Sequence, residues 1–180
     1  MLACCFGVAF FFSARGDIFT VPIEKGAVRN LTNSSNAHDK LARWSPCGAK
    51  IAFMSDISGE DEVWLIDQDG SGEPRQLTSG GDTWRFPPAW SPDSRWIAYS
   101  QEEEQQMPTI YLYSRESKET IAATKGWFAS GEPAFSADGK FLFFVSNRTF
   151  NPTYGQTEFN YSYSDMAKIY LLTLSKETKS

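Results

Sequence analysis

The chain has 180 residues, of which 41% are hydrophobic, 15% aromatic and 22% charged, and this composition excludes a disordered or collagen-like chain. The formal net charge of −5 gives no electrostatic basis for nucleic-acid binding, so we expect no nucleic-acid partner. Three cysteines, Cys4, Cys5 and Cys47, make no disulfide framework and match no zinc-site spacing, so neither a metal nor another cofactor is expected.

The first predicted element lies in the apolar run from Met1 to Phe12. This run has no basic residue before it and falls far short of the roughly 20 residues that span a bilayer, so we expect no membrane partner. A signal peptide is one interpretation of the run. A strand is favoured, because Val8-Ala9-Phe10 matches Ile51-Ala52-Phe53 when an internal repeat is projected backwards.

That repeat is a ten-residue segment that begins at Trp44, Trp90 and Phe135, which are 46 and 45 residues apart. Each copy opens with the aromatic residue, continues through a Ser-Pro or Ser-Ala turn, and ends in a run of β-branched and aromatic residues. Proline presets the turn, and the Asp, Ser or Gly that follows accepts left-handed geometry. We expect the opening aromatic to pack between neighbouring sheets, and the closing run to form a strand covered on both faces.

A second pattern keeps the same period and completes the repeating unit. Four pairs each open an aromatic and β-branched run: Ile18-Phe19, Val63-Trp64, Ile110-Tyr111 and Ile169-Tyr170. Leu31-Thr32 and Leu77-Thr78 close two of the units, and no long 3.6-residue periodicity appears. Each unit is therefore expected to hold four short antiparallel strands in about 45 residues, the size of one β-propeller blade.

The predicted fold class is all-β: a β-propeller fragment of about four blades with four antiparallel strands each, incomplete at both ends. The predicted blades are residues 1–35 (partial), 36–81, 82–126 and 127–180, the last with an insertion at 148–167.

The blade repeat resembles those of the TolB and tricorn protease propellers, with their WD40-like architecture. Residues Ser13 to Gly26 look like tricorn protease in particular. The stretch from Ser146 to Pro152, running on to Tyr163, is similar to a long insertion near the end of the second propeller of tricorn-type peptidases.

This resemblance implies a large serine peptidase in which two propellers filter peptides on their way to and from a C-terminal catalytic core. The catalytic serine, its histidine and their acidic partners lie in that core, so the resemblance transfers no catalytic residue to this chain. It implies as partners the peptide substrates or products, the other domains of the same parent chain, and further copies in a homo-oligomer. It implies a cytoplasmic location, with a periplasmic or secreted one as the alternative.

Two motifs near the start have a functional and a structural interpretation. His38 is the chain's one histidine, and any Ser–His or Cys–His mechanism within the chain would use it. We expect a surface-loop histidine rather than a catalytic base, because it lies in the polar stretch 33–40. Arg15-Gly16-Asp17 spells an adhesion tripeptide, but the expected role is a tight turn between two strands.

Three further polar motifs are also expected to be structural. Asp67 to Gly72 begins like a calcium loop, but the twelfth position is Thr78 rather than Glu, which favours a polar turn. The acidic run Glu102-Glu103-Glu104, followed by Gln105-Gln106, is expected to be a solvated loop tip, the alternative being a channel mouth that repels acidic peptides. Asn30 and Asn147 begin Asn-x-Thr triplets, which matter only in a eukaryotic secretory setting.

The insertion 148–167 carries Phe159, Tyr161 and Tyr163 at alternate positions, which favours an extended segment with one aromatic face. We expect a flap packed on its own propeller, the alternative being an interface with another domain.

The sequence alone is compatible with three functions. The first is a noncatalytic propeller that gates or channels peptides to the catalytic core of a tricorn-like serine peptidase, a core that is absent from this chain. The second is a TolB-like protein-binding module, and the third is the propeller of a prolyl oligopeptidase-type hydrolase. In each case the chain is expected to contain no catalytic, cofactor-binding or metal-binding residue and, on its own, to expose strand edges and blade faces.

Overall fold

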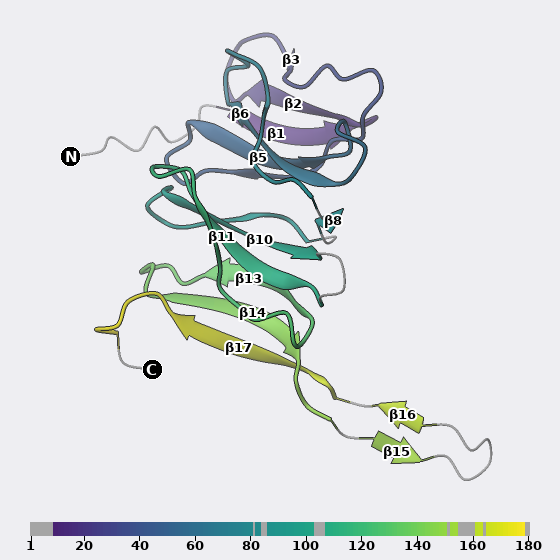
Figure 1. Ribbon diagram of the computed structural model, residues 1–180. Coiled ribbons are helices and arrows are strands. Elements are labelled where there is room, and N and C mark those ends of the chain that lie inside the picture. Colours follow the sequence, from purple (N-terminus) through teal and green to yellow (C-terminus); the bar gives the residue numbers. More distant parts are fainter. Residues whose placement is uncertain are drawn as a thin grey trace.

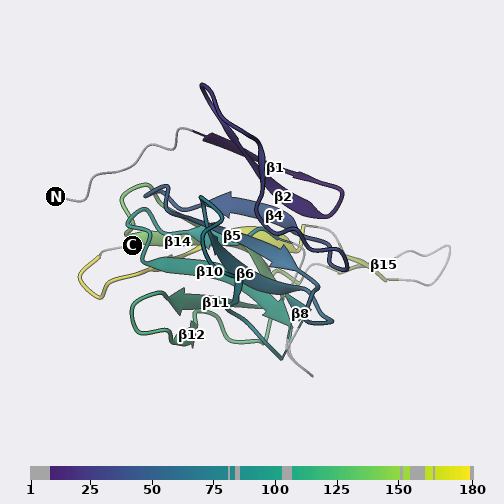
Figure 2. The same cartoon turned by 90° about the horizontal axis from the view of Figure 1, so that it is seen from above.

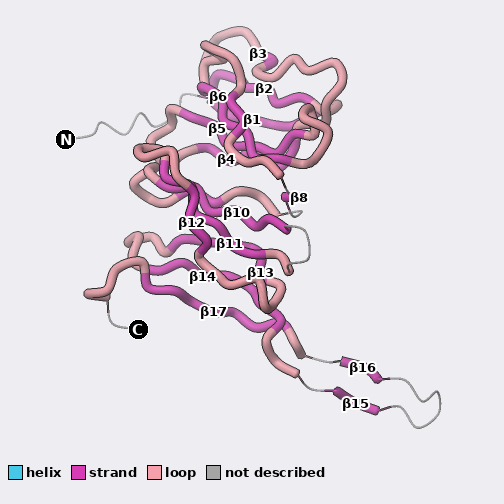
Figure 3. The backbone as a smooth tube through the Cα atoms, in the orientation of Figure 1, coloured by secondary structure: helices cyan, strands magenta, loops and turns pink. Residues whose placement is uncertain are grey.

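A computed structural model describes residues 9–80, 82–83, 86–102, 107–150, 152–154, 161–163 and 165–178, and these residues form strands, turns and loops without an α-helix (Figures 1 and 3). The strands are β1 (Ala9–Ala14), β2 (Asp17–Pro22), β3 (Arg29–Asn30), β4 (Lys40–Trp44), β5 (Lys50–Ser55), β6 (Glu62–Asp67), β7 (Arg75–Gln76), β8 (Asp82–Thr83), β9 (Ala89–Trp90), β10 (Trp96–Glu102), β11 (Thr109–Ser114), β12 (Thr120–Ala122), β13 (Ser130–Phe135), β14 (Phe141–Asn147), β15 (Pro152–Tyr154), β16 (Tyr161–Tyr163) and β17 (Ala167–Thr173). The described residues contain no helix with the length and hydrophobicity needed to cross a membrane.

The strands form four main antiparallel sheets that follow one another along the chain and stack in that order (Figures 1 and 2). The first sheet has the strand order β1-β2-β3, and the second has the order β4-β5-β6-β7. The third sheet has the order β12-β11-β10-β8, with β9 also paired to β10, and the fourth has the order β13-β14-β17. Each sheet is built from neighbouring segments, so the contacts that join distant parts of the sequence lie between sheet faces.

Apolar clusters fill the three spaces between successive sheets. The buried members are Ile18, Leu31, Ala42, Ile51, Phe53 and Ile66 in the first cluster; Ala52, Val63, Leu65, Ile97, Tyr99 and Tyr113 in the second; and Ala98, Ile110, Leu112, Leu142 and Phe144 in the third. Strands β5 and β10 are buried on both faces because a sheet packs against each side. Strand β14 was expected to be covered in the same way, but its burial alternates, because among the described residues the fourth sheet has a neighbour on one side only.

The repeated aromatic residues pack between sheets, as predicted. Trp44 packs against the first cluster, Trp90 against the second and Phe135 against the third. The indole nitrogen Nε1 of Trp90, in the third sheet, donates a hydrogen bond to the carbonyl of Arg43, in the second, at 3.0 Å. Trp90 therefore joins the second and third sheets by a hydrogen bond as well as by apolar packing.

The backward projection of the repeat onto the first strand was wrong by two residues. The matching cross-strand pairs are Ser13–Ile18 in the first sheet and Met54–Val63 in the second. Phe10 lies three residues before Ser13, and Ile51 lies three residues before Met54, so Phe10 rather than Val8 is equivalent to Ile51. The reason is the connection: Ala14 and Asp17 flank a two-residue turn in the first sheet, whereas residues 56–61 join the equivalent strands in the second. A constant period in the sequence cannot register this shorter loop.

The insertion forms a small hairpin. Strands β15 and β16 pair with each other and with no other described strand, and they extend beyond the edge of the fourth sheet (Figures 1 and 3). The expectation of a flap packed on the sheets is therefore wrong for these strands. Phe159 lies outside the described residues, as do the side chains of Tyr161 and Tyr163.

Candidate functional site

A cavity of about 350 Å³ lies between the third and fourth sheets. It is lined by Ser91, Pro92, Asp93, Trp96, Leu112, Ile121, Phe135, Asp138, Gly139 and Leu174. Its walls come from both sheets and are polar and apolar in nearly equal measure, and the turns that precede β10 and β14 contribute one aspartate each. The cavity therefore combines apolar side chains with two carboxylates, and small-ligand sites often combine apolar walls with a few polar groups.

Those turns owe their shape to the serine in the repeat. In each, the amide of the fourth turn residue donates to the serine carbonyl, and the serine Oγ accepts from the amide that begins the next strand. The carbonyl bonds are Gly48–Ser45 (2.8 Å), Ser94–Ser91 (2.8 Å) and Gly139–Ser136 (2.9 Å); the hydroxyl bonds are Lys50–Ser45 (3.0 Å), Trp96–Ser91 (2.9 Å) and Phe141–Ser136 (2.9 Å). The fourth turn residue has a positive φ of 73°, 60° and 69° in the three copies, which explains the Gly, Ser, Gly series.

Both cavity aspartates are held in the ionised form by these turns. Burial would raise the pKa of Asp93, but hydrogen bonds from the Ser91 hydroxyl (2.5 Å) and the Arg95 amide (3.0 Å) outweigh it and lower the pKa. The hydrogen bond from the Ser136 hydroxyl (2.6 Å) is the main cause of the lowered pKa of Asp138. The cavity consequently carries negative charge at neutral pH.

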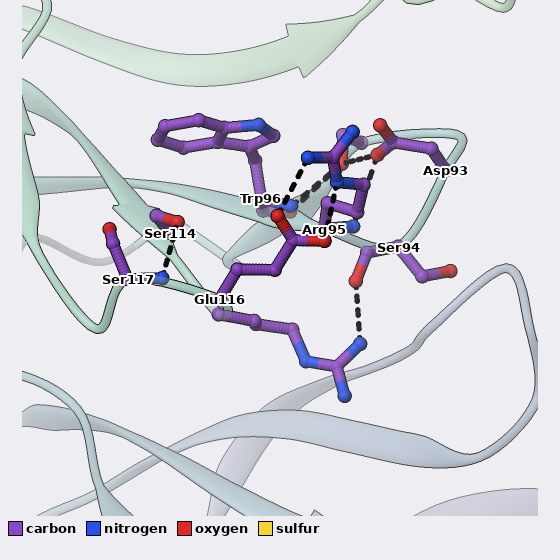
Figure 4. Close-up of polar contacts among 9 residues, drawn as sticks. Asp93, Ser94, Arg95, Trp96, Ser114, Glu116 and Ser117 are labelled. Carbon is purple, nitrogen blue, oxygen red and sulfur yellow. Dashed lines mark hydrogen bonds and ion pairs between the residues drawn. The ribbon is translucent and has the colours of Figure 1, made fainter.

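A second charged group borders the same turn (Figure 4). Arg95 donates from Nε and from a terminal nitrogen to the two carboxylate oxygens of Glu116, at 2.9 Å and 2.7 Å. Beside it, Arg115 donates to the carbonyl of Ser94 at 2.6 Å, and its guanidinium lies 5.5 Å from the ring centre of Trp90. The bidentate pair fixes the turn before β10 relative to the turn after β11.

Cys47 lies in the second-sheet copy of this turn, facing the third sheet. Its amide donates to the Ser94 hydroxyl at 2.9 Å, and its sulfur lies 3.4 Å from Ser45 Oγ. Burial would raise the thiol's pKa, but hydrogen bonds involving Ser45, Ala49 and Ser94 and the charge of Arg115 lower it overall. Cys4 and Cys5 lie outside the described residues.

A different surface is formed by one edge of the stack. Strand β4 contacts β9, and β9 contacts β13, so these strands of successive sheets lie side by side. Strands β4 and β13 each contain a bulge, at Leu41 (φ 53°) and at Glu132 (φ 53°). Such backbone is uncommon for residues other than Gly, and bulges often redirect a side chain. Arg43 on β4 and Glu132 on β13 are exposed along this edge.

In the first three sheets the other edge is secured by a threonine hydroxyl, which the sequence motif Leu-Thr signals in the first two. Thr78 Oγ1 accepts from the buried amide of Val63 at 2.8 Å and donates to the buried carboxylate of Glu62. In the first sheet Thr32 accepts from Ile18 at 3.1 Å, and in the third Thr124 accepts from Ile110 at 3.0 Å. We predicted that Leu-Thr closes a unit but not that its hydroxyl ties the outer strand to the start of the preceding strand.

The motifs near the start lie where turns and loops were predicted. His38 is exposed in the loop between β3 and β4, and its amide donates to Asp56 Oδ1 at 2.7 Å. Arg15 and Gly16 form the two-residue turn between β1 and β2, with φ values of 55° and 86°. Asp17 accepts from Asn30 Nδ2 and from the Ser34 amide, each at 2.9 Å, so its carboxylate organises the loop after β3.

The remaining motifs are placed as follows. In the turn 67–72, Asp69 accepts from the amide and hydroxyl of Ser71, and the part of the chain that the structure describes holds no group of three or more His, Cys, Asp or Glu side chains suited to a metal. Glu102 ends β10, and residues 103–106 lie outside the described residues. Asn147 is exposed at the end of β14.

Stacked antiparallel sheets, each following the previous one in the chain and packed face to face through an anchor aromatic, define the β-propeller class. The predicted fold class is confirmed by this architecture and by the solved structures that share it. The chain belongs to the family described as the tricorn protease second β-propeller domain, which it matches over residues 81–180.

Relatives of known name agree with this assignment. Tricorn protease homolog 1 of Streptomyces coelicolor is 32% identical over 136 residues, which is 76% of this chain and 12% of that protein. Among solved structures, the tricorn protease superposes with a TM-score of 0.75 at 21% identity, over 96% of this chain and 17% of the other. A TolB protein from Agrobacterium tumefaciens gives 0.65 at 21% identity (92% and 57%), and a prolyl endopeptidase gives 0.63 at 15% (94% and 26%). The chain thus spans about an eighth of its tricorn relative's length, and the structural likenesses show the fold alone.

Proposed function

We propose that this chain is a noncatalytic propeller portion of a tricorn-type serine peptidase, and that it gates or channels peptides to a catalytic core elsewhere in the parent protein. The observation that carries the proposal is the family match over residues 81–180. Its partners in this role are peptide substrates or products and the other domains of the parent.

The edge formed by β4, β9 and β13 supports the gating role. Blades are arranged radially around a central channel, so the edges that converge and touch from sheet to sheet are the ones nearest the axis. We assign this edge to the channel side because β4 contacts β9 and β9 contacts β13. Its exposed charges, Arg43 and Glu132, then face the route of a passing peptide.

The test uses the full-length protein that contains this chain, with Glu132→Arg as the perturbation and Glu177→Arg, an exposed position beyond β17, as the matched control. We expect Glu132→Arg to lower kcat/KM for long basic peptides and to raise it for long acidic ones. An exposed charge interaction of about 1 kcal/mol corresponds to about fivefold in each case. Short uncharged substrates should be hydrolysed at an unchanged rate. Identical peptide selectivity in Glu132→Arg and Glu177→Arg would refute gating at this edge.

The TolB-like fold favours one alternative, a protein-binding module without peptidase activity. The likeness to a prolyl endopeptidase favours another, a propeller that guards an α/β-hydrolase site. The domains encoded in the same reading frame separate the three: a PDZ-like domain with a tricorn-type core supports the proposal. A G-x-S-x-G hydrolase domain supports the prolyl oligopeptidase reading, and the lack of any hydrolase domain supports the binding module.

A further inference from the structure

The cavity between the third and fourth sheets has an equivalent position between the second and third, because the sheets repeat. At that position lies the guanidinium of Arg115, which donates to the carbonyl of Ser94 at 2.6 Å and lies 5.5 Å from the ring centre of Trp90. Its positive charge also acts on the Cys47 thiol of the second sheet. A carbonyl, an aromatic ring and a thiol from two neighbouring sheets therefore surround one guanidinium in this interface.

Leu174 is the residue of the fourth sheet that is equivalent to Arg115. The amide of Leu174 donates to the carbonyl of Lys140 at 2.9 Å, as the amide of Arg115 donates to the carbonyl of Arg95 at 3.0 Å. Lys140 and Arg95 each lie five residues after the anchor aromatic of their repeat, which fixes the equivalence. Leu174 lines the cavity, and a leucine supplies no guanidinium there.

Two of the groups that surround the Arg115 guanidinium recur in the cavity. Phe135 is the repeat equivalent of Trp90, and Gly139 is the equivalent of Ser94; both line the cavity. Ser94 and Gly139 have φ values of 60° and 69° and donate the same turn hydrogen bond, so the two turns share one backbone conformation.

The third group is changed from a thiol to a carboxylate. Asp93 stands at the position of Cys47, and it lines the cavity. The hydrogen bonds from Ser91 and the Arg95 amide both end on Asp93 Oδ1, so Oδ2 takes part in neither. Asp138 is the second carboxylate of the cavity, and Lys140 Nζ lies 3.8 Å from its Oδ2. Asp93 is therefore the stronger candidate to pair with a bound cation.

The other walls suit an aliphatic stem. They include Trp96 (Figure 4), Leu112, Ile121 and Leu174. Arginine lays its methylene groups along apolar surface while its charged head reaches polar partners. Its planar guanidinium can stack on a ring and donate to two acceptors at once, which the compact ammonium of lysine does less well. The cavity volume of about 350 Å³ lies in the range of small-ligand sites.

We propose that this cavity binds an arginine side chain of a peptide, its guanidinium stacked on Phe135, donating to the Gly139 carbonyl and paired with Asp93. The peptide arginine takes the place that Arg115 has in the preceding interface. The choice of a peptide as ligand rests on the proposed function. The residues that decide the site belong to the third and fourth sheets themselves, so it does not depend on a further sheet.

The test measures peptide binding by fluorescence anisotropy in the full-length protein that contains this chain, with any catalytic serine blocked by a covalent inhibitor. The probe is a labelled alanine pentapeptide with a central arginine. The matched probe carries citrulline, which keeps the shape of arginine without its charge. We expect the citrulline peptide to bind about tenfold more weakly, because it loses an ion pair and a cation–π contact. Equal affinity of the two peptides, or no binding of either, overturns the proposal.

Asp93→Asn tests the carboxylate. Asparagine keeps a side-chain oxygen for the turn, so the arginine peptide should bind about fivefold more weakly while the citrulline peptide is unaffected. The matched control is Asp69→Asn, since Asp69 also accepts from the amide and hydroxyl of a serine, Ser71, but does not line the cavity. The same affinity for the arginine peptide in both variants contradicts the assigned role of Asp93.

Leu174→Arg supplies the guanidinium from the chain itself. It should raise the melting temperature and weaken binding of the arginine peptide about tenfold or more, because the new side chain forms the contacts that Arg115 forms in the preceding interface. Leu174→Met, similar in size and uncharged, should keep the binding. Undiminished binding in Leu174→Arg overturns the proposal.

The outcome is separate from that of the proposed function. Arginine-specific binding that depends on Asp93, in a protein without a peptidase core, supports this inference and refutes the proposed function. Binding that Asp93→Asn leaves unchanged, in a working tricorn-type peptidase, overturns this inference alone.

Discussion

Replacing Thr78 by Val should destabilise the chain by about 3 kcal/mol, although the two side chains have nearly the same shape. Thr78 is buried, its Oγ1 accepts from the amide of Val63 at 2.8 Å, and it donates to the carboxylate of Glu62. Val63 is fully buried and Glu62 nearly so, which keeps water from replacing the lost hydroxyl. A buried donor without an acceptor costs about 1–3 kcal/mol, and a hydrogen bond to a charged group contributes about 1.5–3 kcal/mol.

The assay is urea unfolding at one protein concentration, followed by circular dichroism, with Thr32→Val as the matched control. Thr32 also accepts from a strand amide, that of Ile18 at 3.1 Å, but it is partly exposed and Asp17 keeps donors from Asn30 and Ser34. We therefore expect a loss of about 1 kcal/mol for Thr32→Val. Equal losses in the two variants would refute the argument that burial of the threonine–carboxylate pair sets the magnitude.

Three further changes test other contacts. Burial alone would raise the pKa of Asp17, but its hydrogen bonds outweigh this effect and lower the pKa below its ordinary value of 3.8. The free energy of unfolding that Asp17 contributes is therefore present above pH 3.8 and is lost as the pH falls through the lower pKa of the folded state. Asp17→Asn should accordingly flatten the acid side of a plot of unfolding free energy against pH. The Arg148 guanidinium lies 4.7 Å from the ring centre of Tyr170 and within 5.8 Å of the ring centres of Phe128 and Phe144. Arg148→Leu should therefore lower the free energy of unfolding by about 1–2 kcal/mol, measured by thermal melting. An unchanged melting temperature would show that these contacts contribute nothing. Ser91→Ala removes the acceptor of the Trp96 amide and should cost about 1 kcal/mol by urea unfolding, a value that Ser91→Thr should largely restore.

The sequence predicted the sheets because their signals are local. Each copy of the repeat contains, in contiguous residues, an anchor aromatic (Trp44, Trp90 or Phe135), the turn that follows it and the strand after that turn. The local sequence of each copy is therefore enough to predict its structure. Repetition then supplied what one copy lacks, namely that similar units pack on one another.

What the sequence did not predict depends on loop length or on contacts across sheets. The two-residue turn at Arg15 and Gly16 moves β1 out of the 45–46-residue spacing of the other copies. The sequence of β1 itself contains no signal of this change. The cavity between Asp93 and Asp138 exists only because two turns 45 residues apart face each other. The bulge that exposes Glu132 likewise arises from pairing between β13 and β14, since glutamate itself does not favour a positive φ.

The same repetition explains why burial differs between equivalent positions. Ala98, Ile110 and Leu112 are buried while their counterparts Phe143, Ile169 and Leu171 are exposed, although all six are apolar. Local propensity and pattern are alike in the two sets, so the difference comes from the neighbour that packs on each. In a stack of this kind each sheet is stabilised by its own hydrogen bonds and by one interface per neighbour. The apolar character of Phe143, Ile169 and Leu171 is therefore set by the repeat itself, whereas their burial depends on whether another sheet packs on them.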